Sequence, residues 1–175
     1  MRSFLMFVLV LCLFASCSKA PVKTSPRLSP GEQAPVFVLP NMLTAEEVTI
    51  GRVFYDNNAT VLIFWSMACP VCREALLEMD QLSEEYRGKA IQFFAINFDV
   101  ENLQGVKAFV KGENLKMPVL SDRRGIVTKS YKAYDYTFSL FVVNREGRLL
   151  MVQYDHTPDL KLRVGKLLDE IISGL

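Results

Sequence analysis

The feature that most constrains the fold of this chain is a pair of cysteines, Cys69 and Cys72, set between two different hydrophobic patterns. Residues 60–65 form a continuous apolar run, which is typical of a strand buried on both faces of a parallel sheet. From Cys72 to Tyr86, apolar residues recur every three or four positions, which is the period of a helix with one buried face. This strand–turn–helix unit predicts an α/β fold.

The rest of the body continues the alternation of strands and helices. The pattern predicts short edge strands at 36–39 and 48–50, a buried strand at 91–97, helices at 106–114 and 126–133, a short strand at 118–120, and a hairpin of 140–144 with 149–154. A last helix is expected to begin at Thr157 as N-cap, with Pro158 at its first position and Asp159 favourable for the helix dipole. The predicted fold is therefore α/β, a central mixed sheet flanked by helices.

The spacing Cys69-Pro-Val-Cys72 suits a disulfide that opens and closes within one helical turn. Cys69 falls at the helix N-terminus, where the free N–H groups and the dipole favour a thiolate. Pro70 fits the first helical position, where its missing N–H is not needed. Cys72 lies one turn later, on the apolar face. We therefore expect Cys69 to be the exposed nucleophile and Cys72 the buried resolving thiol of a thiol–disulfide exchange.

A Cys-x-x-Cys pair can also be half of a zinc site or an inert pair. A zinc site needs two more ligands, and the body beyond residue 17 offers no other cysteine and the single histidine His156. His156 is interpreted mainly as a surface residue before the last helix. No metal and no other cofactor is expected, and the strand–turn–helix context favours redox chemistry.

The N-terminus reads as an export signal. Arg2 precedes an apolar run at 4–15, which is too short for a bilayer core of about 20 residues but suits a signal peptide. Phe14-Ala-Ser-Cys17 resembles a bacterial lipobox, so residues 1–16 are expected to be a lipoprotein signal and Cys17 the lipidated residue. Residues 17–33 are expected to be a flexible tether, and 34–175 the folded domain.

The charge of the chain adds no further class of partner. The formal net charge is +1, and without residues 1–16 the chain carries 19 basic and 19 acidic residues, so nucleic acid is not expected as a partner. Export would place the domain in a compartment where disulfides persist. We expect a lipid-anchored protein of the cell envelope that faces the periplasm, and Ser18 after Cys17 favours the outer membrane by resemblance to lipoprotein sorting.

Residues 31–175 resemble the TlpA/ResA-like branch of the thioredoxin superfamily, which borders the AhpC/TSA group. The resemblance rests on Gly31-Glu-Gln-Ala-Pro35, Phe64-Trp-Ser-Met-Ala-Cys-Pro-Val-Cys-Arg-Glu74, Pro118-Val-Leu-Ser-Asp122 and Phe141-Val-Val-Asn-Arg-Glu-Gly147. It implies a thioredoxin-like fold with an extra αβ insertion between Ile91 and Ala133. It also implies a thiol–disulfide oxidoreductase, usually a reductase, that acts on exported proteins and receives electrons from a membrane thiol transporter.

Several positions depart from the pattern of that branch. Phe138 stands where the family places a cis-proline opposite the Cys pair, so we expect a trans bond and a differently shaped loop there. Ile63 replaces the acid that many thioredoxins bury under the pair, and Ala75 replaces a glutamate. We therefore expect slow resolution of the mixed disulfide. By resemblance Trp65, Phe138 and Ser139 would border the substrate groove, although Trp65 is equally well explained as a core residue.

Three other functions remain open on the sequence. A copper-handling protein like the Sco type would use a Cys pair with wider spacing and a histidine ligand, and copper titration would reveal it. A peroxiredoxin-like peroxidase would need a Pro-x-x-x-Thr-x-x-Cys run, which 60–69 lacks. A non-catalytic thioredoxin-like binding module is compatible with the altered residue Phe138.

Overall fold

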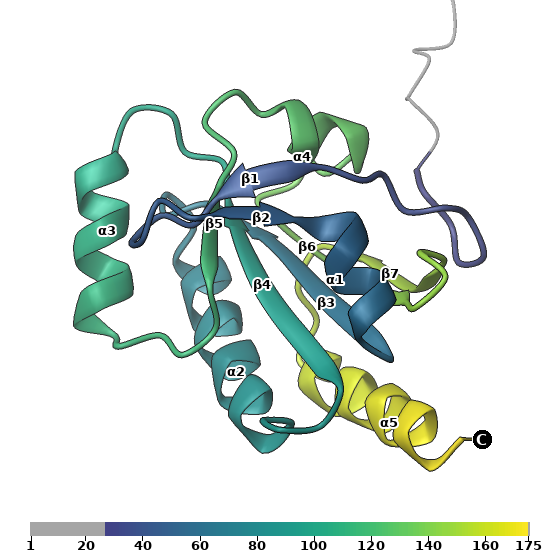
Figure 1. Cartoon of the computed structure of the whole chain (residues 1–175). Helices are drawn as coiled ribbons and strands as arrows, with labels where there is room; N and C mark the ends of the chain where they lie inside the picture. Colours follow the sequence, from purple (N-terminus) through teal and green to yellow (C-terminus); the bar gives the residue numbers. More distant parts are fainter. Residues whose placement is uncertain (1–26, 175) are drawn as a thin grey trace, which may run out of the picture.

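A five-stranded mixed sheet forms the centre of the computed structural model, which describes residues 27–174 (Figure 1). The expected signal peptide and Cys17 lie outside the described residues. The strands follow the order β5-β4-β3-β6-β7. Their bounds are Ala59–Trp65 for β3, Ile91–Asn97 for β4, Val119–Ser121 for β5, Phe138–Asn144 for β6 and Leu149–Tyr154 for β7.

The three strands β3, β4 and β5 are parallel. β6 pairs with β3 in the antiparallel sense, and β7 pairs with β6 in the antiparallel sense. β3 lies at the middle of the sheet and is buried along its whole length, which explains its unbroken apolar sequence. Because β3, β4 and β5 run the same way, their carboxyl ends meet at one edge of the sheet. Residues that follow these strands are therefore brought together although they are far apart in sequence.

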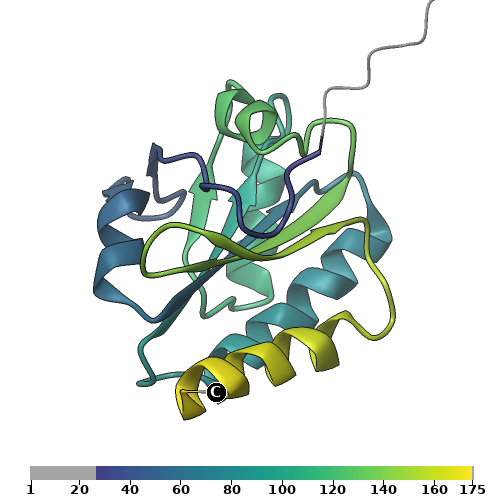
Figure 2. The same ribbon diagram turned by 90° about the vertical axis from the view of Figure 1, so that its right-hand side faces the viewer.

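Helices cover one face of the sheet more completely than the other (Figure 2). The first face packs against α2 (Pro70–Glu85), α3 (Leu103–Gly112) and α5 (Leu160–Ser173), and its core contains Cys72, Leu76 and Val164. The second face packs against α1 (Ile50–Asp56), α4 (Ile126–Ser130) and the hairpin of β1 (Val38–Pro40) and β2 (Glu47–Thr49). The expected central mixed sheet with flanking helices is confirmed.

The structure corrects several details of the predicted elements. Helix α1 was not predicted, because it is short and buries only Ile50 and Phe54. The strand expected at 48–50 is β2, and it ends at Thr49, where α1 begins. β1 and β2 pair with each other in a separate sheet. The N-cap of α5 is Asp159 and not Thr157, because residues 157–159 form a turn in which the N–H of Leu160 donates to the Thr157 carbonyl.

The folded domain begins earlier than the predicted boundary at residue 34. The N–H of Gly31 donates to Leu149 O at 2.7 Å, and the N–H of Leu149 donates to Glu32 O at 2.9 Å. Arg27 Nε donates to the Tyr136 hydroxyl at 2.6 Å. Residues 27–33, which the sequence assigned to a flexible tether, are thus attached to β7 and to the segment before β6. Within residues 27–174, no helix combines the length and apolar character needed to cross a bilayer.

Candidate functional site

Cys69 and Cys72 form a disulfide at the beginning of α2. Their sulfur atoms are 2.04 Å apart and their Cα atoms 5.2 Å apart. Cys69 is the N-cap residue of the helix, and its Sγ accepts a hydrogen bond from the Cys72 N–H at 3.2 Å. Pro70 is the first helical residue, as its chemistry predicts. The pair therefore has the strand–turn–helix context that the sequence indicated.

The two cysteine residues differ in their exposure to solvent. Cys72 is 2% exposed and belongs to the core beneath α2, whereas Cys69 is half-buried and has exposed neighbours on both sides, Ala68 and Pro70. Val71, between Pro70 and Cys72, is also exposed. An external thiol or disulfide can reach Cys69 much more readily than Cys72. This asymmetry supports the division of roles between an outer nucleophile and an inner resolving thiol.

Asp99, which follows β4, binds the loop that leads to Cys69. Its Oδ1 accepts from Ser66 Oγ at 2.6 Å, and its Oδ2 accepts from the Met67 N–H at 2.7 Å and from Asn97 Nδ2 at 2.8 Å. We call Ser66, Met67, Asn97 and Asp99 the Asp99 clasp. The sequence alone did not predict this clasp. The only available signal was the position of Asn97 and Asp99 at the carboxyl end of a predicted parallel strand next to β3.

Arg73 supports the same loop from the helix side. Its Nη1 donates to Met67 O at 2.8 Å, so both backbone groups of Met67 are bonded. Ile63 lies in the core with no exposed surface, and the buried Ala75 also supplies no titratable group beneath the pair. Neither side chain can therefore accept a proton from Cys72.

Phe138 is the first residue of β6, the strand next to β3. It is opposite Trp65 in the β3–β6 register, and the peptide bond before it is trans, since the described residues contain no cis bond. Trp65, Phe138 and Ser139 are all buried, with at most 1% exposure. Their side chains therefore do not line an open groove, because β3 and β6 turn them into the two cores. Among the expected supporting residues, only Pro70 is exposed.

His156 is placed against Phe138, a position that its sequence context did not indicate. The two rings meet edge to face with centroids 5.9 Å apart. His156 Nε2 lies 3.7 Å from Glu78 Oε2 on α2. His156 thus contacts the residue at the family's cis-proline position and also lies near the Glu78 carboxylate. In the part of the chain that the structure describes, no group of three or more His, Cys, Asp and Glu side chains is arranged to hold a metal ion.

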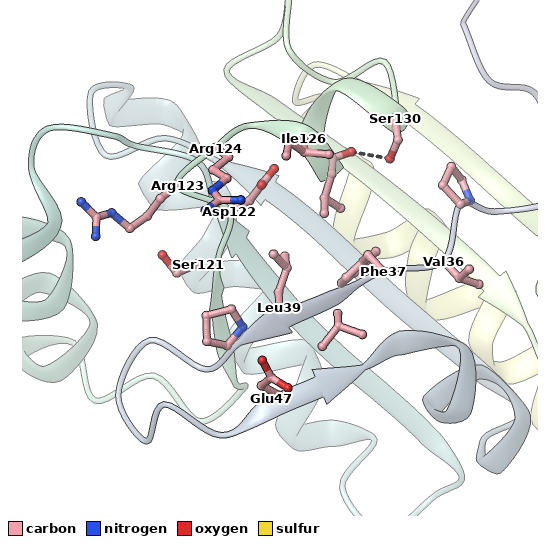
Figure 3. Close-up of a pocket in the computed structure, with 14 residues that line it drawn as sticks. Val36, Phe37, Leu39, Glu47, Ser121, Asp122, Arg123, Arg124, Ile126 and Ser130 are labelled. Carbon is pink, nitrogen blue, oxygen red and sulfur yellow. Dashed lines mark hydrogen bonds between the residues drawn. The ribbon is translucent and has the colours of Figure 1, made fainter.

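A concavity lies on the other face of the sheet and is separate from the disulfide (Figure 3). It has a volume of about 700 Å³ and lies between the segment 35–40 and residues 121–130. Phe37 and Leu39 contribute apolar surface, and Arg123 and Arg124 stand near its rim. It contains none of the residues that the sequence singled out for redox chemistry.

Comparison with known families and curated proteins gives consistent matches. The model of the AhpC/TSA family matches residues 30–152. The thiol-disulfide oxidoreductase ResA of Bacillus thuringiensis is 28% identical over 120 residues, which are 69% of this chain and 66% of the relative. The sporulation thiol-disulfide oxidoreductase A of Bacillus subtilis is 24% identical over 117 residues, 66% of this chain and 68% of the relative. The chain thus spans slightly less than two thirds of the ResA relative.

Solved structures show the same fold. A Chlorobium tepidum protein assigned as a thiol:disulfide interchange protein of the DsbE type superposes with a TM-score of 0.73 at 23% identity, covering 83% of this chain and 99% of that one. StoA from Bacillus subtilis superposes with a TM-score of 0.62 at 21% identity, covering 76% of this chain and 97% of that one. The expected resemblance to ResA-like, thioredoxin-superfamily proteins is confirmed, and so is the thioredoxin-like fold.

Proposed function

Because this chain belongs to the AhpC/TSA family, and within it resembles the ResA-like oxidoreductases, we propose that it is a thiol–disulfide oxidoreductase that works through Cys69 and Cys72. The observation that carries the proposal is a half-buried Cys69 at a helix N-terminus, joined by a disulfide to the buried Cys72 one turn later. This arrangement allows Cys69 to react with a client disulfide and Cys72 to resolve the mixed disulfide afterwards.

The proposed direction is reduction of a client disulfide. The Cys69 thiolate attacks one sulfur of the client, the client S–S bond breaks, and one client thiolate leaves and takes up a proton. The Cys72 thiolate then attacks the Cys69 sulfur of the mixed disulfide and releases the second client thiol. Two electrons pass from the protein dithiol to the client, and the protein is left with the Cys69–Cys72 disulfide. A thiol donor must then reduce it for another cycle.

The surroundings of the pair favour a slow second step. Cys72 is buried, and the positions of Ile63 and Ala75 supply no base to remove its proton. The proposed partners are exported proteins that carry thiols or disulfides, with a membrane thiol transporter as the electron donor. The N-terminal sequence supports a lipid anchor at Cys17 and a place in the cell envelope facing the periplasm, somewhat more in the outer than in the inner membrane.

The decisive experiment compares Cys69→Ser with Cys72→Ser in the full chain, with Cys12→Ser and Cys17→Ser introduced so that only one reactive pair is titrated. Insulin serves as a model protein disulfide. The parent protein, once reduced, is expected to reduce insulin catalytically with dithiothreitol as donor. Cys72→Ser is expected to accumulate a covalent mixed disulfide through Cys69, and Cys69→Ser is expected to form none.

The reduction potential of the parent gives the direction. Equilibration in glutathione or dithiothreitol buffers with thiol trapping should give a value near that of thioredoxin, about −270 mV, for a reductase. A value near −120 mV, typical of strong oxidants, would reverse the direction. A pair that does not cycle would contradict the enzyme and favour a binding module, and rapid loss of hydrogen peroxide would favour a peroxidase.

A further inference from the structure

The Asp99 clasp is connected to the nucleophile through a short stretch of backbone. The Cys69 N–H donates to Ser66 O at 3.3 Å, and the Ala68 N–H donates to Ser66 Oγ at 3.2 Å. The same Ser66 hydroxyl donates to Asp99. Ser66 and Met67 therefore bind the Asp99 carboxylate directly, and Ala68 is linked to it through Ser66. Asp99 lies just after β4, the strand next to β3.

The clasp also places a negative charge next to the loop of the redox pair. Asp99 contacts the backbone of Met67, two residues before Cys69. A carboxylate close to a thiol disfavours the thiolate, whereas the N-terminus of α2 favours it. The two effects oppose each other at Cys69. Their balance sets how stable the reduced, thiolate-bearing form is, and this stability determines the reduction potential.

Other charged groups near the loop are few. The groove beside it contains three charged side chains, and its lining is Met67, Ala68, Arg73, Asp99, Val100, Glu101 and Asn102. The exposed Glu101 adds negative charge, and Arg73 opposes both acids from α2 while it is bonded to Met67 O. On the β6 side, the His156 ring packs against Phe138, and its Nε2 lies near the Glu78 carboxylate. Asp99 is the acid that bonds directly to the loop.

We propose that Asp99 is a positioning residue that makes the Cys69–Cys72 pair more reducing: its carboxylate is bound to the loop at Ser66 and Met67, and its negative charge disfavours the Cys69 thiolate. This inference rests on the proposed function, in which Cys69 is the nucleophile. It assigns to Asp99 a role that a neutral residue of the same shape would not reproduce.

The test separates charge from geometry with two pairs of variants in the full chain, again with Cys12→Ser and Cys17→Ser. Asp99→Asn and Asp99→Ser remove the charge, whereas Asp99→Glu and Ser66→Ala keep it and alter the clasp. The Cys69 pKa is read from the pH dependence of iodoacetamide alkylation of the reduced protein. The reduction potential is measured in glutathione buffers, and circular dichroism confirms the fold of each variant.

Both neutral variants are expected to lower the Cys69 pKa by about half a unit to one unit. The equilibrium constant for reduction should rise about threefold, which corresponds to about 14 mV at 29.6 mV per tenfold change. Asp99→Glu and Ser66→Ala should leave the pKa close to that of the parent. Because Asn and Ser differ in size, failure of one to fold leaves the other to decide.

Two results would overturn the inference. One is an unchanged pKa and potential in a folded neutral variant, which would leave Asp99 with a structural role alone. The other is an equal shift in Ser66→Ala, which would assign the effect to loop geometry and not to charge. Failure of the parent protein to cycle would instead contradict the proposed function, so the two failures are distinguishable.

Discussion

Two segments border the disulfide, and they are held in opposite ways. The loop before Cys69 is held by hydrogen bonds to a carboxylate, chiefly from Ser66 and Met67 to Asp99. The segment that leads into β6 and ends at Phe138, the first residue of that strand, is held by aromatic packing, as in the edge-to-face contact of Phe138 with His156. The two meet where the Ser66 N–H donates to Thr137 O at 3.2 Å. One border of the site thus depends on charge and the other on buried area.

The aromatic border extends well beyond the site. The Tyr131 ring packs against Phe64 and Phe141 with centroids 5.0 Å away in each case, and the Tyr136 ring lies 4.7 Å from that of Tyr154. Dispersion and the hydrophobic effect depend little on pH or salt. Substitutions on the polar side can therefore change the chemistry of the cysteine pair, while the packed side keeps the geometry of the sheet constant.

The largest expected effect comes from removing the ring on the packed side. Phe138→Ala should lower the free energy of unfolding by about 3–5 kcal/mol, because Phe138 is buried and its loss leaves a cavity. Urea denaturation of the oxidised full chain measures it. The matched control is Tyr134→Ala in the same segment, where the ring is 58% exposed and little should change. Equal losses in the two variants would contradict the comparison.

Much of the packed side could be predicted from the sequence, and little of the polar side could. The apolar run at 60–65 and the three-to-four spacing after Cys72 report burial directly, so β3, α2 and the burial of Cys72 followed from local pattern. The burial of Phe138 was less clear, since the family pattern suggested a loop near substrate. β6 begins at Phe138 itself and turns the ring into the core.

The Asp99 clasp could not be derived because its partners are distant in sequence. Ser66 and Asp99 are 33 positions apart and meet only because β3 and β4 are parallel and in register. Hydrogen bonds of this kind leave no periodic signal in either segment. The position of His156 against Phe138 has the same origin, since β7 brings the chain back beside the start of β6. Helix α1 was missed for a different reason: it is short, and its two buried residues, Ile50 and Phe54, are too few to show a helical period.

On the polar side, Ser66→Ala is expected to lower the free energy of unfolding by about 1.5–3 kcal/mol, the range for hydrogen bonds to charged groups. The variant removes one donor from Asp99 and the acceptor of the Ala68 N–H. The matched control is Ser83→Ala, whose hydroxyl donates only to Asp80 O within α2 and should matter much less. Urea denaturation compares them. A loss no greater than in the control would show that the clasp does not hold the loop.

The smallest expected effect appears at alkaline pH, and it tests whether the packed side stays closed to water until the domain unfolds. Burial raises the pKa of Tyr131 far above its ordinary value of about 10. The folded protein therefore holds this proton more tightly than the unfolded chain. The resulting stabilisation is fully present below pH 10 and is lost as the pH rises above it, with a slope of about 1.4 kcal/mol per pH unit.

Tyr131→Phe should remove that slope, although it also loses the hydrogen bond from the Tyr131 hydroxyl to Pro35 O and is less stable at every pH. The measurement is urea denaturation between pH 8 and 11, and the slope, not the level, is the result. Tyr55→Phe is the control, because Tyr55 is 72% exposed and should leave the slope unchanged. Burial also raises the pKa of Tyr86 and Tyr154, so part of the alkaline loss should persist. An unchanged slope in Tyr131→Phe would mean that the ring gains access to water before the domain unfolds, and the aromatic border would then be looser than its packing indicates.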